Sequence, residues 1–182
     1  DTSDARTPQA IARLGLSEEI TEALLSHDTH VSLQMEGATA FGVFVDWRHQ
    51  RGVDIGAHSF ARSEKEVGWL HFAVGKDVLV TARRQALRSV EQVHQHVRGG
   101  VHFDSAAELL EAIVEQFAAS VSHATDELGT ELDRIEDRVL TDRLGEERRD
   151  LAVLRRQGVH MHRPLTALRR VLKQFESRHA AS

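Results

Sequence analysis

Three side chains in this 182-residue sequence have the types and the spacing that could bind a metal ion: His123, Asp126 and Glu127. Residues three and four positions apart share one face of an α-helix. An imidazole and two carboxylates are ligands for zinc or another divalent cation. The high total of 12 histidines is the only other sign of metal binding. We therefore predict a metal site at these residues; the alternative is three solvated side chains, since this spacing also arises by chance.

The other histidines are weaker candidates for metal ligands. His27 and His30, with Asp28 between them, could converge in a turn. Histidines two residues apart point to nearly opposite sides of a helix, so they cannot bind one ion. That geometry excludes the pairs His94–His96 and His160–His162.

Arg83, Arg84 and Arg88 stand where a strand is predicted to lead into a helix. Such a cluster could hold an anion at the helix N-terminus; solvation or pairing with acidic residues is the alternative. The sequence lacks the G-x-S-x-G, G-x-x-x-x-G-K-[ST], H-E-x-x-H and G-x-G-x-x-G motifs, so we predict no catalytic residue and no enzyme. The absence of cysteine excludes disulfides, thiolate chemistry and cysteine-based zinc sites.

Composition is typical of a soluble globular protein, with 41% hydrophobic and 28% charged residues. The net charge of −5 and the pI of about 6.2 do not favour a nucleic-acid partner. No run of apolar residues is long enough to span a membrane. The chain starts at Asp1 without a signal segment and stops in an arginine-rich stretch, so we expect a piece of a longer protein.

Two long amphipathic helices must carry the candidate metal ligands. The first is predicted from Ser105 to about Thr141 and the second from about Leu144 to Phe175. Apolar residues recur every three or four positions in both, and in the second they form a heptad seam. Pro164 predicts a kink in the second helix, and Gly158 predicts close backbone approach. The apolar positions of the first helix are Leu110, Ile113, Phe117, Val121, Ala124, Leu128, Leu132, Ile135 and Val139.

Charge divides between these two helices. Acidic residues outnumber basic ones from Glu108 to Asp150, and the excess is basic from Leu151 onward. An antiparallel hairpin would place part of the basic arm beside the acidic arm. Exposed ion pairs contribute only about 0–1 kcal/mol each, so we expect the apolar stripe to stabilise the hairpin and the charges to set its register.

Residues 1–104 are predicted to form an α/β domain and residues 105–182 a helical hairpin. Alternating residues from Val31, the buried run Phe41–Val45 and the hairpin formed by 67–74 and 78–82 predict strands. The segment from Asp46 to Gly56 reads as a loop, and Ser17 and Ser105 as helix caps. The fold class is therefore α+β: a mixed, largely antiparallel sheet packed with helices, followed by a long antiparallel helical hairpin.

Three passages resemble those of ZntB-type zinc transporters, a branch of the CorA metal-transporter superfamily. Val78–Glu91 is similar to the passage "T-x-R-R-x-x-L-R-x-V-E". Asp126–Leu140 is similar to "D-E-L…L-D-x-x-E-D-x-V-L", and Leu154–Leu165 to "L-R-R…P". The motifs are degenerate, but their order and spacing over about Val67 to Phe175 are fairly specific.

The resemblance implies the N-terminal cytoplasmic domain of a homopentameric divalent-cation transporter, with zinc as the cation, in the bacterial inner membrane. It implies a stalk, two membrane helices and a Gly-x-Asn pore loop further along the full-length protein, none of which this sequence contains. We expect a regulatory and structural role in gating and assembly. The alternatives are a soluble adaptor whose hairpin docks a protein partner and a soluble metal-dependent enzyme.

Overall fold

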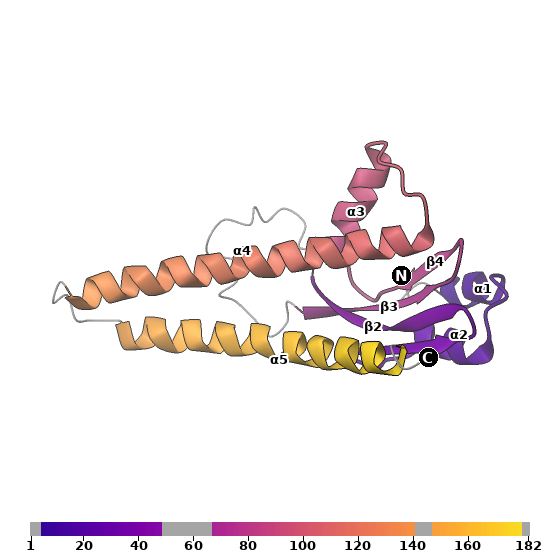
Figure 1. Ribbon diagram of the computed structural model, residues 1–182. Coiled ribbons are helices and arrows are strands. Elements are labelled where there is room, and N and C mark those ends of the chain that lie inside the picture. Colours follow the sequence, from indigo (N-terminus) through magenta and orange to yellow (C-terminus); the bar gives the residue numbers. More distant parts are fainter. Residues whose placement is uncertain (1–4, 49–66, 141–146, 180–182) are drawn as a thin grey trace.

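The computed structural model describes residues 5–48, 67–140 and 147–179 (Figure 1). A small layer of helices and strands forms one end of the molecule, and two long helices project from it side by side. The elements in chain order are α1 (Thr7–Ala12), α2 (Glu18–Leu25), β1 (Ser32–Glu36), β2 (Thr39–Trp47), β3 (Val67–Val74), β4 (Leu79–Ala82), α3 (Arg88–Arg98), α4 (Ala106–Leu140) and α5 (Glu147–His179).

The described strands form one sheet in the order β1-β2-β3-β4, with every neighbouring pair antiparallel. Gly37 takes the positive φ of 58° that the turn between β1 and β2 needs. The Gly75 N–H donates to the Val78 carbonyl at 2.9 Å and closes the turn between β3 and β4. The structure confirms the predicted class, an antiparallel sheet with helices followed by a helical hairpin.

Strand β2 is longer than its apolar run predicts. Asp46 and Trp47 continue the strand and are buried, although the sequence placed them in a loop. An aspartate can end a strand in the interior only when hydrogen bonds replace its water, and here residues of α3 supply them. The rest of the predicted loop, residues 49–56, lies outside the described residues.

Two apolar clusters hold the helices against the sheet. The smaller cluster packs α1 and α2 on the strands and includes Ile11, Leu24 and Phe41. The larger one joins the strands to α3, α4 and α5. Phe117 of α4 lies at its centre, edge-on to Phe44 and stacked on Trp47, with ring centroids 5.1 and 6.0 Å away. The base of the long hairpin is therefore part of the same core as the sheet.

Both predicted helix caps are present. The Ser17 hydroxyl accepts from the Ile20 N–H at 3.3 Å, and Ser105 accepts from the Glu108 N–H at 3.1 Å. The Glu108 carboxylate reaches back one residue further than a standard capping box and accepts from the Asp104 N–H at 2.6 Å. These bonds fix the point at which α4 leaves the sheet.

The two arms confirm the predicted long helices, with 35 residues in α4 and 33 in α5. Their seam is tight near the sheet, where Phe117, Ala124 and Met161 are buried, and looser farther out. Leu132 and Leu151 are 40% and 41% exposed, although Ile135 on α4 is 1% exposed. The expected close approach at Gly158 is wrong: an added Cβ there would meet nothing within 4 Å. Helix α5 runs through Pro164 without interruption, and the kink expected there stays a prediction.

Candidate functional site

The structure brings two of the three predicted metal ligands together. Nε2 of His123 lies 3.8 Å from Oε1 of Glu127, one helical turn later on α4. The His123 side chain is 56% exposed, whereas Glu127 is 19% exposed. The pair is thus open to solvent on one side and could take up an ion only with further ligands.

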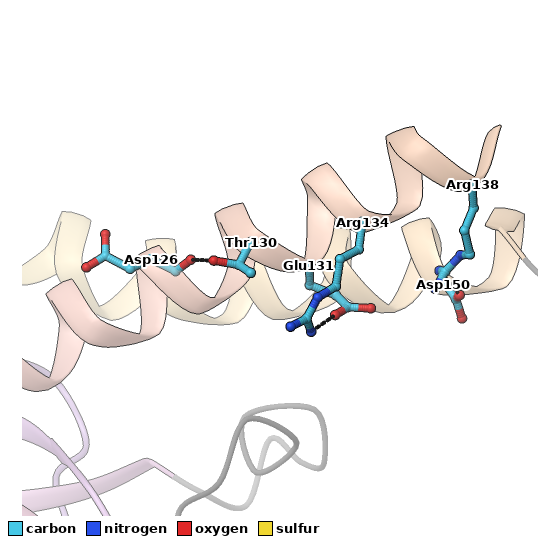
Figure 2. Close-up of polar contacts among 6 residues, drawn as sticks. All are labelled: Asp126, Thr130, Glu131, Arg134, Arg138 and Asp150. Atoms are coloured by element: carbon cyan, nitrogen blue, oxygen red, sulfur yellow. Dashed lines mark hydrogen bonds and ion pairs between the residues drawn. The ribbon is translucent and has the colours of Figure 1, made fainter. Parts of the chain in front are cut away.

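Asp126 does not complete this pair. It is exposed and lies one residue before Glu127, about 100° away around the helix. Its backbone carbonyl accepts a hydrogen bond from the Thr130 hydroxyl at 3.0 Å (Figure 2). No group of three or more His, Cys, Asp or Glu side chains arranged to hold a metal occurs within residues 5–48, 67–140 and 147–179. The metal site at His123, Asp126 and Glu127 therefore stays a prediction.

The turn around Asp28 brings His30, but not His27, into contact with the carboxylate. Oδ1 of Asp28 accepts from the backbone N–H of His30 at 2.9 Å and lies 2.6 Å from its Nδ1. The hydrogen bond with the His30 ring lowers the pKa of Asp28 below 3.8. His27 and Asp28 line a small pocket of about 70 Å³ that also includes His71.

His71 is packed inside the protein. Its Nδ1 lies 2.8 Å from the Ala23 carbonyl of α2, and the residue is 6% exposed. Because a carbonyl can only accept, Nδ1 carries the proton in this bond. The histidine thus ties the sheet to α2.

The N-terminus of α3 is occupied by the chain's own carboxylate. Oδ2 of Asp46 accepts from the Ser89 N–H at 3.0 Å, and Oδ1 accepts from the Ser89 hydroxyl and the Trp47 N–H, both at 2.7 Å. Burial raises the pKa of Asp46 above 3.8, and the bonds from Ser89 and Trp47 oppose that rise. Asp46 is thus a cap supplied from a distant strand.

This capping contact changes the interpretation of the arginine cluster. The position that an external anion would take at α3 is filled by Asp46. Arg83 lies 4.0 Å from Glu91, a residue of α3 itself, so its neighbour is an acidic side chain rather than an open site. Sequence reasoning missed Asp46, although a lone acid at the end of the buried run Phe41–Trp47 is a usable sign of such a contact.

An ion pair joins the two arms near their far end. Arg138 of α4 lies 2.7 Å from Asp150 of α5, and Arg134 lies 3.2 Å from Glu131 within α4 (Figure 2). Both residues of the Arg138–Asp150 pair belong to the stretch from Glu108 to Asp150, in which acidic residues are in excess. The pair does not join that stretch to the basic one that starts at Leu151, so the predicted pairing of the two stretches stays a prediction. No helix among the described residues is long and apolar enough to cross a membrane.

The model of the family described as "CorA-like Mg2+ transporter protein" matches residues 1–182, the whole sequence. The chain belongs to the CorA-like Mg2+ transporter family. Because this is a family of transporters, membership confirms the prediction that the chain is not an enzyme. No curated protein matches the chain.

Solved structures similar to this CorA-family chain share its fold at low sequence identity. The full-length CmaX protein is 20% identical with a TM-score of 0.75, over 92% of this chain and 50% of that one. The soluble domain of CorA from Methanocaldococcus jannaschii is 16% identical with a TM-score of 0.68, over 93% and 65%. The ZntB cytoplasmic domain from Vibrio parahaemolyticus is 11% identical with a TM-score of 0.59, over 100% and 86%.

These comparisons place the chain in the CorA family but in no particular branch of it. The chain spans about half the length of the full-length CmaX protein. Its TM-score is lower with the ZntB domain than with CmaX or the CorA domain, so the shared fold does not favour the ZntB branch.

Proposed function

We propose that this chain is the cytoplasmic domain of a divalent metal-ion transporter, in which it has a regulatory and structural role. The observation that carries the proposal is the hairpin. Arms of about 50 Å project from a core that they share with the sheet, in a chain that a transporter-family model matches throughout. A rigid arm rooted in a compact domain can transmit a change at one end to the other.

We further propose assembly as a homopentamer at the bacterial inner membrane, with the membrane part supplied by other segments of the full-length protein. Long helices with exposed outer faces support this assembly role, because such faces can bury surface against a second copy. A ligand could shift the position of the arms only through different affinities for the two arrangements.

Zinc is the cation that we propose. The passages Val78–Glu91 and Asp126–Leu140 support the ZntB branch, and His123 with Glu127 supplies two zinc-type ligands at 3.8 Å. Structural zinc sites use four ligands. The described residues of one copy bring two such ligands together, and we propose that a second copy supplies the others.

Metal contents of cells test both the transport function and the cation. The complete gene would be expressed in bacteria, and cellular zinc, magnesium, cobalt and nickel would be measured against an empty vector. We expect a change in zinc that exceeds the change in the other metals. A change in magnesium instead would retain the transporter and correct the cation, whereas unchanged contents of all four would favour the adaptor.

A further inference from the structure

The two arms carry opposite charges. Helix α4 has nine acidic and two basic residues, and α5 has nine basic and three acidic residues. In a hairpin of this kind the charges could neutralise one another across the seam. One such pair, Arg138–Asp150, crosses the seam; six acids of α4 and five arginines of α5 lie on the outer faces of the arms.

Glu127 and Glu131 of α4 are only partly exposed, but six of its nine acidic residues lie on its outer face. They recur at steps of three, four, seven and eleven residues, which are close to whole numbers of helical turns. All are exposed, and the buried residues Ile113, Phe117 and Ala124 occupy the opposite side of the helix. The acidic outer face consists of Glu108, Glu111, Glu115, Asp126, Asp133 and Glu136.

Five of the nine basic residues of α5 also lie on an outer face. Arg148 and Arg155 are seven residues apart, as are Arg156, Arg163 and Arg170, and all five are exposed. The buried Met161 marks the opposite side. Asp150, by contrast, lies on the inner side, where it pairs with Arg138. The five arginines form the basic outer face.

Each outer face therefore presents one sign of charge along the arm. The acidic face of α4 and the basic face of α5 cannot contact each other within one molecule, because the seam between the helices separates them. They can meet in a contact between two copies, with α4 of one copy against α5 of the next. Such a head-to-tail contact uses two different patches and closes into a ring when the rotation permits.

We propose that the acidic outer face of α4 binds the basic outer face of α5 in a second copy of this chain. The positions of the charged residues along the two arms support this contact. The Arg138–Asp150 pair fixes which residues of the antiparallel arms lie at equal height. In a ring whose arms run along its axis, neighbouring copies keep equal heights, and Asp133 faces Arg155 while Asp126 faces Arg163.

The inference deepens the proposed assembly role, and it can be tested without any transport. The sequence contains no cysteine, so introduced cysteines report contacts without background. Gly129→Cys adds a thiol to the outer side of α4, where an added Cβ meets nothing within 4 Å. Val159→Cys adds one to the outer side of α5, at a residue 43% exposed. The two positions lie at equal height in the proposed contact.

Mixing the two single-cysteine chains under mild oxidation tests the pairing. If the two chains are mixed in equal amounts, random pairing makes half of all disulfide dimers mixed. At low ionic strength we expect the mixed dimer to exceed that half. The excess should fall at 1 M salt, where the screening length is about 3 Å. Val97→Cys at the end of α3, 45% exposed, replaces Gly129→Cys in the control and should give no excess. Random pairing in both mixtures would overturn the proposal.

Charge reversal gives a second test by sedimentation of the single chain. We expect self-association to be lost in Asp126→Lys/Asp133→Lys and in Arg155→Glu/Arg163→Glu, and restored when all four changes are combined in one chain. The matched control Asp77→Lys/Arg98→Glu alters exposed residues off the arms and should associate like the wild type. Failure of the four-fold variant to associate, with a helical circular dichroism spectrum intact, would overturn the proposal. If the complete gene product still transports a cation in that case, the proposed function is retained and only the proposed contact is rejected.

Discussion

Asp46 shows how a single residue can join elements far apart in the sequence. Its carboxylate lies at the end of β2 and accepts from both the backbone and the hydroxyl of Ser89 in α3. Acids are rarely buried, so a sequence pattern assigns such a residue to a loop. Its hydrogen-bond partner, Ser89, is 43 residues away in the sequence, and no local sequence pattern reveals that contact.

The raised pKa of Asp46 predicts a pH dependence of stability. The folded protein holds this proton more tightly than the unfolded chain, so the group's contribution to stability is fully present below the unfolded pKa of 3.8 and is lost as the pH rises through the folded pKa. Asp46→Asn lacks this titration. We expect the free energy of unfolding of the wild type, minus that of the variant, to fall as the pH rises from about 4. Urea unfolding at several pH values measures it, and a difference that rises or stays constant would contradict the assignment.

His123 and Glu127 were predicted as ligands from their spacing alone, and the structure places them 3.8 Å apart. Spacing on a helix is enough to predict a pair, but a third ligand from another element or copy is beyond such reasoning. Titration calorimetry with zinc tests the pair. We expect His123→Ala/Glu127→Ala to lower the zinc affinity at least tenfold, about 1.4 kcal/mol, and His162→Ala, on α5, to leave it unchanged. Equal affinity of the double variant and the wild type would remove the site.

At the scale of the element, periodicity predicted most of the secondary structure. The 3.6-residue repeat marked α4 and α5 to within a few residues because an amphipathic helix repeats one choice over many turns. The burial of each apolar residue along the seam was less predictable. Leu132 and Leu151 follow the apolar pattern and are still partly exposed, because burial depends on a neighbour that the pattern does not contain.

Gly158 provides a test of that loose seam. Since nothing lies within 4 Å of an added Cβ, Gly158→Ala should stabilise the protein by about 0.5–1 kcal/mol through helix propensity alone. Gly42→Ala is the contrasting change. Its Cβ would lie 2.0 Å from the Ser32 carbonyl oxygen, and we expect a loss of about 1–3 kcal/mol or more. Thermal unfolding measures both; destabilisation by Gly158→Ala would mean that the helices approach closely there.

Ile135 tests whether packing holds the outer half of the hairpin. It is 1% exposed, so Ile135→Ala should reduce the free energy of unfolding by about 2–5 kcal/mol. Leu140, five residues later and 84% exposed, is the matched control, and its alanine variant should change stability by less than about 0.5 kcal/mol. Arg138→Ala removes a half-exposed ion pair and should cost about 0–1 kcal/mol. Equal losses in denaturant unfolding for Ile135→Ala and Leu140→Ala would contradict a packed hairpin.

At the scale of the whole molecule, the order of elements identified the fold and the family better than any single site did. The passage Val78–Glu91 and the two long arms led to the CorA superfamily. The family model confirms this family, and the similar structures confirm the fold. The branch and the cation depend on a few side chains, which low-identity fold comparison does not resolve.

Cation flux through the complete gene product in proteoliposomes tests the central claim most directly. A metal-sensitive dye enclosed in the vesicles would report the entry of zinc and of magnesium. The account predicts protein-dependent flux of a divalent cation, faster for zinc than for magnesium. Vesicles that contain the folded, oriented protein and admit neither cation faster than protein-free vesicles would contradict the claim that this domain belongs to a divalent metal-ion transporter.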